Sequence, residues 1–253
     1  MLNTLLTRVR HGRRTTSFPA QEPTLPERFR GLPLLHPERC TDGCQGCIEA
    51  CPTAAIRGEA GRLAIDLGRC LFCPACAQAC AAGAIELSHD YRLAVRDRAA
   101  LQLTPGAPLA LAEPLGKELR RLLGRALKLR QVSAGGCNGC EVELNALGNT
   151  IFDAGRFGIQ FVASPRHADG LLVTGPVSAA MREPLLTTYR AVPRPKIVIA
   201  CGACAISGGP FAGHPEVNDG IGDLLPVDLF CAGCPPHPFT LLDGLLRLLG
   251  RRA

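Results

Sequence analysis

The sequence has few aromatic residues and no long apolar run. Phe, Trp and Tyr make up 4% of its 253 residues, and tryptophan is absent. No apolar stretch approaches the roughly 20 residues that a membrane-spanning helix needs. Arg13 and Arg14 form the pair that opens a twin-arginine export signal, but Pro19 and polar residues follow where such a signal has an apolar segment. We therefore expect neither export nor a transmembrane segment.

The formal net charge of +6 is unevenly distributed. Residues 1–39 include seven basic and three acidic residues. Residues 89–136 include nine basic and four acidic residues. Basic stretches of this kind bind nucleic acid, anionic lipid or an acidic protein face. Because no aromatic residues are interleaved with the basic ones and no nucleic-acid-binding motif is present, we exclude nucleic acid as a partner.

The fourteen cysteines fall into two groups, which indicates two domains. Eight lie between Cys40 and Cys80, six lie between Cys137 and Cys234, and none lies from 81 to 136. An even cysteine count in a short secreted protein would indicate disulfides. This chain is long and shows no cleavable secretory leader, so we expect metal ligation in a reducing cytoplasm instead.

The first group is an internal repeat. The pattern Cys-x-x-Cys-x-x-x-Cys occurs twice with an offset of 29 residues, at Cys44, Cys47 and Cys51 and at Cys73, Cys76 and Cys80. Such a duplication is typical of a two-cluster ferredoxin, where the last cysteine of each motif binds the other cluster. Zinc sites use pairs of Cys-x-x-Cys at wider separation, so zinc is disfavoured.

This spacing predicts two [4Fe–4S] clusters with exchanged ligands. Cluster A is expected to use Cys40, Cys44, Cys47 and Cys80, and cluster B is expected to use Cys70, Cys73, Cys76 and Cys51. Cys40 is one residue farther from its motif than Cys70 is from the second copy. The small residues after Cys51 and Cys80 are expected to bring backbone N–H donors close to the cluster sulfurs.

Two further segments show helical periodicity. Residues Leu2, Leu5, Leu6 and Val9 define the apolar face of a short basic helix, and the proline-rich run from Pro19 to Pro37 is expected to be extended. The N-terminal segment is either a solvated leader or an arm on a partner subunit or membrane surface, and we favour the arm. A second amphipathic helix is predicted over 115–127, where packing against the neighbouring domain is favoured over docking of a partner.

The C-terminal part alternates between strands and helices. Strands are predicted over 160–163, 170–173, 196–200 and 225–230, and helices over 141–147, 184–191 and 239–249. Apolar strands separated by helices indicate a parallel, doubly wound sheet, whose ligands gather at the carboxyl ends of the strands. Two cysteines follow each of the last two strands, so we expect their thiols to converge.

Six thiols in this part compete for the four positions of one cluster. They form three Cys-x-x-Cys pairs, at Cys137 and Cys140, Cys201 and Cys204, and Cys231 and Cys234. Spacing alone does not choose among them. Glycines flank Cys204 and Cys234 and permit close backbone approach to a cluster. Cys201 and Cys231 instead end apolar strands and suit buried packing.

These motifs resemble a known family. Residues 130–253 resemble the iron–sulfur small subunit of membrane-bound, energy-converting nickel–iron hydrogenases of the formate-hydrogenlyase and CO-induced kind, and more distantly the homologous small subunit of respiratory complex I. The resemblance rests on the segments 135–143, 164–169, 202–209, 225–228 and 233–236. Residues 1–90 resemble the dicluster ferredoxin-like subunit of the same complexes, so the chain resembles a fusion of the two. It departs from the pattern at Cys40, at Ala81 where proline is usual, and in the additional Cys201 and Cys231.

The resemblance implies roles for single residues. The ligands of a proximal [4Fe–4S] cluster carry over to Cys137, Cys140, Cys204 and Cys234. Complex I subunits have two adjacent cysteines where this chain has Cys137 and Cys140, which favours the hydrogenase side.

Three charged residues lie in or near these motifs. Glu143 matches an acidic position that relays protons, with a carboxylate favoured by the helix dipole as the alternative. For Glu141 we favour the second interpretation, a carboxylate that the dipole at the start of the helix stabilises. Arg166 is expected near the cluster, where its charge would raise the potential, and a surface salt bridge is the alternative.

The sequence thus predicts an α+β protein with two domains, a dicluster ferredoxin fold followed by an α/β flavodoxin-like parallel sheet. The expected divisions are a basic arm over 1–38, the dicluster domain over 39–90, a linker with an amphipathic helix over 91–130 and the proximal-cluster domain over 131–253.

The predicted function is electron transfer without catalysis by this chain. Three [4Fe–4S] clusters would relay electrons to the catalytic large subunit of a group 4 type nickel–iron hydrogenase, with any nickel–iron centre on that partner. We expect further subunits of a membrane complex as partners and a location on the cytoplasmic face of the membrane. The alternatives are the equivalent subunit of a complex I-like quinone oxidoreductase or metal-free hydrogenase-related complex, and a free-standing carrier or sensor.

Overall fold

A six-stranded sheet with the strand order β5-β11-β10-β9-β7-β8 organises the C-terminal part of the computed structural model, which describes residues 2–12, 14–58, 62–123 and 125–252. Its strands are β5 (Ala94–Val95), β7 (Leu127–Ser133), β8 (Ile159–Phe161), β9 (Gly170–Thr174), β10 (Ile197–Cys201) and β11 (Leu229–Cys231). All neighbouring pairs are parallel except β5 and β11. The central strands β9, β10 and β11 are buried along their whole length, as expected for a parallel sheet covered on both faces.

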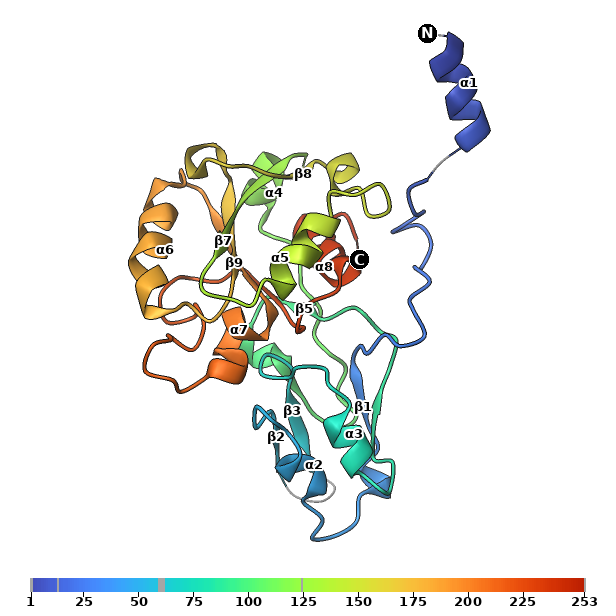
Figure 1. The fold of residues 1–253 in the computed structure, drawn as a ribbon, viewed down its shortest axis with the longest axis vertical. Coiled ribbons are helices and arrows are strands. Elements are labelled where there is room, and N and C mark those ends of the chain that lie inside the picture. The colour runs from blue at the N-terminus through green and yellow to red at the C-terminus, as the bar shows by residue number, and fades with distance from the viewer. Residues whose placement is uncertain (1, 13, 59–61, 124, 253) are drawn as a thin grey trace.

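Helices cover both faces of this sheet (Figure 1). They are α4 (Lys117–Leu123), α5 (Gly139–Ala146), α6 (Ala179–Ala191), α7 (Gly202–Ser207) and α8 (Pro238–Leu248). Residues of α5 and α8 pack with Leu172 and Ile199 on one face. Residues of α6 and α7 pack with Val173 and Val198 on the other, because successive strand residues point to opposite faces.

The four predicted strands and three predicted helices of this part are present, with shifted ends. The prediction missed β7 and α7 and extended the helix of 115–127 into β7, whereas α4 ends at Leu123. Apolar periodicity alone does not separate the end of a short helix from the start of a strand.

The ferredoxin-like part shows the repeat in its elements. They are β1 (Pro33–Leu35), α2 (Gly46–Glu49), β2 (Ile56–Arg57), β3 (Ala64–Asp66), α3 (Ala75–Ala79), β4 (Ile85–Leu87) and β6 (Gln102–Leu103). The starts of α2 and α3, and those of β2 and β4, are separated by the same 29 residues as the cysteines. Strand β1 pairs with β4, and β3 lies between β2 and β6. The short 3₁₀ helices of the chain are η1 (Pro37–Arg39), η2 (Arg98–Leu101), η3 (Ala154–Phe157), η4 (Pro165–His167) and η5 (Gly209–Phe211).

Two predicted divisions differ from the structure. The segment expected to be a linker contributes β5 and β7 to the large sheet and β6 to the small one. The expected arm contributes β1 to the ferredoxin-like part. Strands of two or three residues are too short to show a hydrophobic period, and they are fixed by the backbone of their partners instead.

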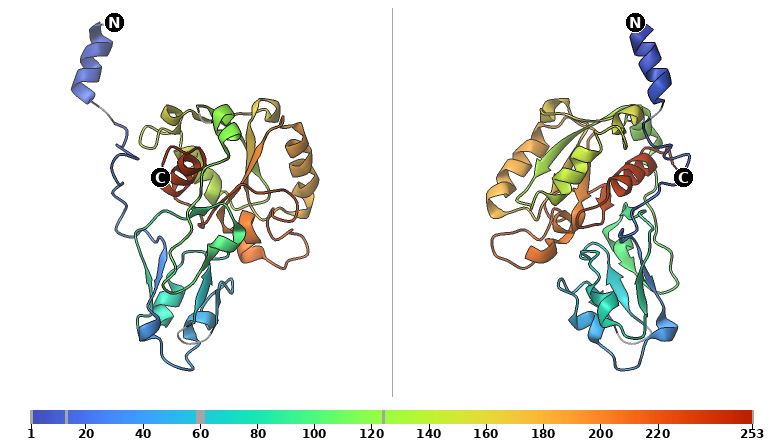
Figure 2. Two further views of the ribbon diagram at one scale, coloured as in Figure 1. Left: turned by 180° about the vertical axis from the view of Figure 1, so that it is seen from behind. Right: turned by 45° about the vertical axis from the view of Figure 1, so that its right-hand side comes forward.

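The two cysteine-bearing parts, which adjoin in both views of Figure 2, share a hydrophobic core. Ile56, Leu67 and Phe72 belong to the same buried cluster as Val173 and Ala205. At the boundary, the Ser207 hydroxyl donates to the carbonyl of Gly68 at 2.8 Å, and the Arg98 guanidinium pairs with the Asp66 carboxylate at 2.7 Å. The ferredoxin-like part is therefore packed directly below α7.

The N-terminal segment begins with an isolated helix and then lies along the C-terminal part. Phe18 is buried, with its ring centroid 5.1 Å from that of Phe239 and 6.1 Å from that of Tyr91. Arg156 donates to the carbonyls of Thr16 and Phe18. Helix α1 (Leu2–His11), which confirms the predicted amphipathic helix, stands away from the body in Figures 1 and 2 and has no buried residue. Of the helices in the described ranges, none has the length and apolar character to cross a membrane.

Candidate metal centres

The cysteines predicted for cluster A lie together at the end of the molecule that carries α2. Cys40 follows η1, Cys47 lies in α2, and Cys80 directly follows α3. Burial, followed by the nearby charges of Cys80, Cys40 and Cys44, raises the pKa of the Cys47 thiol. The structure therefore places Cys40, Cys44 and Cys80 within electrostatic reach of Cys47.

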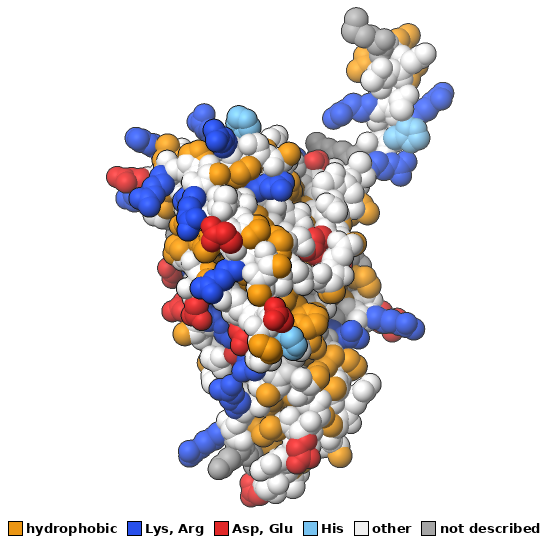
Figure 3. All heavy atoms as spheres, turned by 60° about the vertical axis from the view of Figure 1, so that its left-hand side comes forward, with side chains coloured by type: hydrophobic (Ala, Val, Ile, Leu, Met, Phe, Trp, Pro, Cys, Tyr) orange, Lys and Arg blue, Asp and Glu red, His pale blue; other side chains and the backbone are white. Residues whose placement is uncertain are grey.

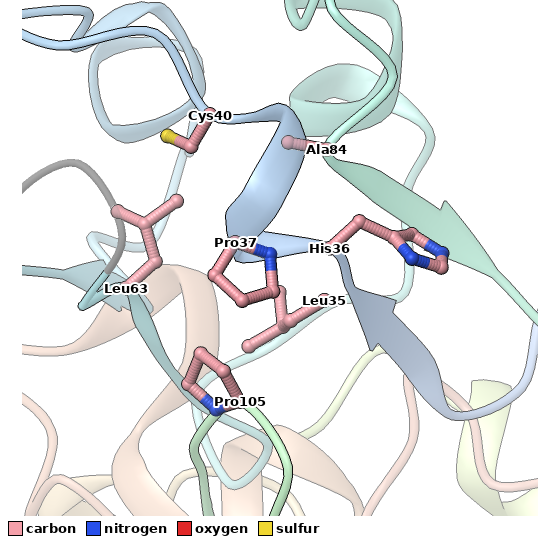
Figure 4. Close-up of a pocket in the computed structure, with 7 residues that line it drawn as sticks. All are labelled: Leu35, His36, Pro37, Cys40, Leu63, Ala84 and Pro105. Atoms are coloured by element: carbon pink, nitrogen blue, oxygen red, sulfur yellow. The ribbon is translucent and has the colours of Figure 1, made fainter.

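An apolar pocket lies beside Cys40 (Figure 4). Cys40 and Ala84 lie at one end of it and Pro105 at the other. The side chains of Leu35, Pro37 and Leu63 form much of the remaining wall. An apolar wall next to a sulfur ligand keeps water away and lowers the local dielectric, and both properties tune a bound cluster.

The cysteines predicted for cluster B line one cavity. Its wall includes Cys51, Cys70, Cys73 and Cys76. Burial, together with the charges of the other three, raises the pKa of Cys70 to about 12, and burial and Cys73 raise the pKa of Cys76 to about 11. Thiols held protonated in this way become metal ligands only when a cation offsets the cost of burying their charge.

Backbone donors lie at the two positions that the repeat predicts. The N–H of Ala55 donates to the Cys51 sulfur, and the N–H of Ala84 donates to the Cys80 sulfur, both at 3.2 Å. Each donor lies four residues after its cysteine, so the two bonds are related by the repeat. A further bond runs from the Phe72 N–H to Cys70 at 3.3 Å. Donors to ligand sulfurs are one of the means by which proteins set cluster potentials.

The cysteines predicted for the proximal cluster converge at the carboxyl ends of β7, β10 and β11. Cys137 precedes α5, Cys140 lies in its first turn, Cys204 lies in α7, and Cys234 follows β11. Burial and the charges of Cys234, Cys140 and Cys137 raise the pKa of Cys204 to about 12. Cys204 is buried, whereas Cys137 and Cys234 are exposed. The four sulfurs thus form one group with an open side.

Two glycines provide the space for this group. Gly202 has a φ of +88°, and a Cβ atom there would lie 2.6 Å from the sulfur of Cys140. Gly209 has a φ of +55°, and a Cβ atom there would lie 3.0 Å from the sulfur of Cys204. The left-handed backbone and the close sulfur atoms both require glycine. The approach of these two glycines to the sulfurs is consistent with the role expected for glycine near Cys204.

The remaining two cysteines are buried, as predicted. Cys201 and Cys231 are neighbours in the register of β10 and β11, and both have 0% exposure. Burial raises the pKa of Cys231 to about 12. For Cys201, a hydrogen bond with Cys140 and burial raise the pKa well above its ordinary value. The sequence did not predict this contact between Cys201 and Cys140.

The cysteines predicted for cluster B lie near the predicted proximal group. Burial and the charges of Cys140, Cys137 and Cys73 raise the pKa of Cys234. Cys73 belongs to the set predicted for cluster B, so a residue of each set lies within electrostatic reach of the other. The Arg30 side chain donates to the carbonyl of Phe72 at 2.8 Å and holds the loop that precedes Cys73.

The two glutamates of α5 have different environments. Glu141 is buried and accepts hydrogen bonds of 2.6 Å from the hydroxyls of Ser133 and Thr174. Burial alone would raise its pKa, but these bonds and a backbone bond outweigh burial and lower the pKa. For Glu143, burial raises the pKa, and the side chain lines a pocket with Cys234. Of these two glutamates, Glu143 is the one that combines an elevated pKa with a position beside the proximal group.

Arg166 falls outside this group, whereas His237 lines the same pocket as Glu143 and Cys234. Arg166 lies in η4, which precedes the amino end of β9, whereas Cys204 follows the carboxyl end of β10. This placement does not support the expectation that Arg166 acts beside the cluster, because opposite ends of parallel strands are separated by the length of the sheet. His237 caps α8 by accepting from the Phe239 N–H at 3.2 Å, which fits the structural role expected for the histidines.

The donor atoms in the three groups fit [4Fe–4S] clusters. All predicted ligands are thiols, several are partly buried, and backbone N–H groups contact two sulfurs of the cluster A and cluster B sets at matched positions. Within the described ranges, no group of three or more His, Cys, Asp or Glu side chains is arranged so that it could hold a metal ion. The thiolates of a cubane bind one iron each, so a cluster does not require ligands that share a single ion.

The sites define an iron–sulfur protein, and comparison with known sequences gives its family. The "4Fe-4S dicluster domain" model matches residues 27–85, and the "NADH ubiquinone oxidoreductase, 20 Kd subunit" model matches residues 137–248. The chain belongs to the family of this 20 kDa subunit, which includes hydrogenase subunits, and carries a dicluster domain before it. The family resemblance inferred from the motifs is confirmed.

Three curated relatives show the extent of the similarity. Formate hydrogenlyase subunit 7 of Escherichia coli (strain K12) is 47% identical over 132 residues, which cover 52% of each chain. The probable membrane-bound hydrogenase subunit mbhJ of Pyrococcus furiosus is 43% identical over 136 residues, covering 54% of this chain and 81% of the relative. An NADH-quinone oxidoreductase subunit of Citrifermentans bemidjiense is 48% identical over 109 residues, which cover 43% of this chain and 64% of the relative. The chain thus spans about half the length of formate hydrogenlyase subunit 7.

Proposed function

We propose that this chain is an electron-transfer subunit that relays single electrons between two ferredoxin-type [4Fe–4S] clusters and a proximal [4Fe–4S] cluster. The observation that carries the proposal is the pocket that Cys234 lines together with Leu71 and Phe72, which lie between Cys70 and Cys73, because it joins two of the three cysteine groups. The proximal cluster would face the catalytic large subunit of a membrane-associated nickel–iron hydrogenase of group 4 type. Any nickel–iron centre would lie on that partner.

The proposed ligand sets follow the grouping of sulfurs described above. They are Cys40, Cys44, Cys47 and Cys80 for cluster A, Cys70, Cys73, Cys76 and Cys51 for cluster B, and Cys137, Cys140, Cys204 and Cys234 for the proximal cluster. The bound clusters would supply one-electron redox chemistry. The chain itself would hold the sulfurs, exclude water with its apolar walls and donate backbone N–H groups to them.

We further propose two domains, with a flavodoxin-like sheet in the second. Counted along the chain from β7, the five parallel strands have the order 2-1-3-4-5, which is that of flavodoxin-like sheets. A bound group at the carboxyl ends of such strands is the common arrangement. The position of Cys137, Cys204 and Cys234 at that edge supports this reading.

A complex I-like function is the second candidate, and the similarity to the NADH-quinone oxidoreductase subunit favours it. The spacing of Cys137 and Cys140 favours the hydrogenase, since complex I subunits resemble this pattern but have two adjacent cysteines at this place. Sequencing of the large subunit that co-purifies with this chain separates the two. Two Cys-x-x-Cys pairs on that subunit would supply nickel–iron ligands, and their absence would leave the quinone or metal-free alternatives.

Iron and sulfide analysis with paramagnetic resonance tests the proposal itself. The chain, purified without oxygen, is expected to contain about twelve iron atoms in three cubane clusters. About eight iron atoms would remove one of the three sites. A chain that carries all its clusters but purifies as a monomer from gentle detergent extracts would instead support a free-standing carrier.

A further inference from the structure

Helix α1 exposes a complete apolar face. The side chains of Leu2, Leu5, Leu6 and Val9 are 71%, 61%, 48% and 81% exposed. At 100° per residue these four fall within about 100° of the helix circumference, so they form a single stripe. In the body of the molecule, most large apolar residues are buried in the two large cores, and exposed ones such as Leu34, Leu122 and Ile151 lie in separate segments. The stripe therefore has no partner within the described chain.

The charge around this stripe is of one sign. Arg8 and Arg10 fall on either side of the apolar stripe, and His11 and Arg14 follow. The first acidic residue of the sequence is Glu22, so nothing nearby neutralises the arginines. Arginines that flank an apolar stripe can extend their charged ends toward a polar surface while their aliphatic stems remain beside the apolar residues.

The body holds the chain a few residues after α1. The Thr16 N–H and hydroxyl both donate to the carbonyl of Ile151, at 3.2 and 3.1 Å, and Arg156 donates to the carbonyl of Thr16 at 2.7 Å. Helix α1 is thus tethered closely to the C-terminal part. Figure 1 shows it at one end of the longest axis, with α2, which contains Cys47, at the opposite end.

We propose that α1 lies in the interface of an anionic lipid bilayer and attaches this chain to the membrane directly. The leucine side chains and Val9 would insert at the boundary between the lipid headgroups and the acyl chains. The arginines would pair with the lipid phosphates. The space-filling view in Figure 3 shows both kinds of side chain on the isolated helix. This attachment rests on the proposed function and deepens it, because it places α2 and cluster A on the side away from the membrane, where an electron donor in water can reach the exposed Cys44.

Flotation with vesicles tests the attachment on the full chain with its clusters assembled. The probes are vesicles of phosphatidylcholine alone and vesicles of equal parts phosphatidylcholine and phosphatidylglycerol. The chain is expected to float with the anionic vesicles, to remain in solution with the neutral ones and to be released by salt. The double variant Leu5→Glu/Leu6→Glu is expected to bind at least about tenfold more weakly. Arg8→Glu/Arg10→Glu is expected to weaken binding more than about fivefold.

Matched variants on the body serve as controls. Leu122 is 59% exposed on α4, close to the value for Leu5, so Leu122→Glu tests whether any exposed leucine matters. Arg182→Glu on the exposed side of α6 tests whether any arginine matters. Both are expected to float like the wild type. Because the sequence has no tryptophan, Leu6→Trp also introduces a single indole whose emission should shift to shorter wavelength on anionic vesicles.

Two outcomes would overturn the membrane assignment. One is that the wild-type chain floats with neither vesicle, and the other is that the Leu5→Glu/Leu6→Glu variant floats as well as the wild type. If that variant instead loses its large subunit during purification while vesicle binding is unchanged, a protein groove and not lipid covers α1. Iron content and resonance spectra are measured on the same samples, so a failure of the attachment is distinguished from a failure of the electron-transfer proposal.

Discussion

The eight cysteines of the ferredoxin-like part lie within residues 40–80, whereas the four proposed ligands of the proximal cluster are spread from 137 to 234. In the first region, short loops and the single turns α2 and α3 bring the sulfurs together. In the second region, the parallel sheet must form before its strand ends present Cys137, Cys204 and Cys234 at one edge. The first site depends on local spacing, and the second depends on long-range packing.

The largest expected effect is the loss of the proximal cluster alone, which would distinguish the second region from the first. Cys204→Ser should remove the proximal cluster and lower the iron content by about four atoms per chain, with clusters A and B unchanged. Paramagnetic resonance of the reduced protein measures this loss. Cys231→Ser, at a buried position in β11, is the control that should keep all three clusters. Loss of all signals in Cys204→Ser would show that the two regions do not assemble independently.

A smaller effect is expected from the glycine that makes room for Cys140. Gly202→Ala places a Cβ atom 2.6 Å from that sulfur and strains a residue with a φ of +88°. Gly106→Ala is the control, since Gly106 has a φ of +76° but no atom within 4 Å of the added carbon. Both variants should lose about 1–2 kcal/mol of stability from the left-handed backbone. Only Gly202→Ala should also lose iron from the proximal site, as measured by iron content after gel filtration.

A third variant changes turnover without changing the clusters. Glu143→Gln should slow proton-coupled turnover of the assembled complex by about tenfold or more, because the amide cannot accept and release a proton. Burial keeps the pKa of Glu143 above its ordinary value, which favours proton transfer nearer to neutral pH. Glu141→Gln is the matched change on the same helix, and it should affect stability through Ser133 and Thr174 instead. Unchanged turnover in Glu143→Gln would exclude the relay.

The smallest expected effect is a shift in the midpoint reduction potential of the proximal cluster. Cys201→Ala removes the hydrogen bond with Cys140, so the proximal cluster should become harder to reduce, with a more negative midpoint potential. Cys231→Ala, one strand away in the same register, should leave the potential unchanged. Redox titration followed by paramagnetic resonance measures both. Equal shifts in the two variants would assign the effect to core packing and not to the bond with Cys140.

The same contrast explains how far the sequence could predict the structure. The fixed spacing of Cys44, Cys47 and Cys51 and its repetition at Cys73 predicted which sulfurs of the first region would meet. The second region could be predicted only as far as the carboxyl ends of its strands. Spacing did not choose among its six thiols, and the family resemblance made that choice. The contact between Cys201 and Cys140 joins residues of two elements far apart in the chain, which no local pattern encodes.

Other differences have equally physical causes. Strands β5 and β6 have two residues each, so they carry no periodic signal, and their segment was expected to be a linker. Arg166 was expected near the cluster from its position in a matching segment, but η4 precedes a strand and so lies at the other end of the sheet. Helix α1 was predicted from the spacing of its leucines alone, because amphipathic helices are encoded locally.

Strand β5 pairs with β11 immediately before the segment that carries Cys234. A strand that follows the ferredoxin-like cysteines in the chain is therefore built into the sheet that carries the last proposed proximal ligand. The two halves of the electron path cannot dissociate unless that sheet is broken. Under the proposed function, electron exchange between cluster B and the proximal cluster is an event within one molecule, with a rate that is independent of protein concentration and a fixed one-to-one ratio of the two halves.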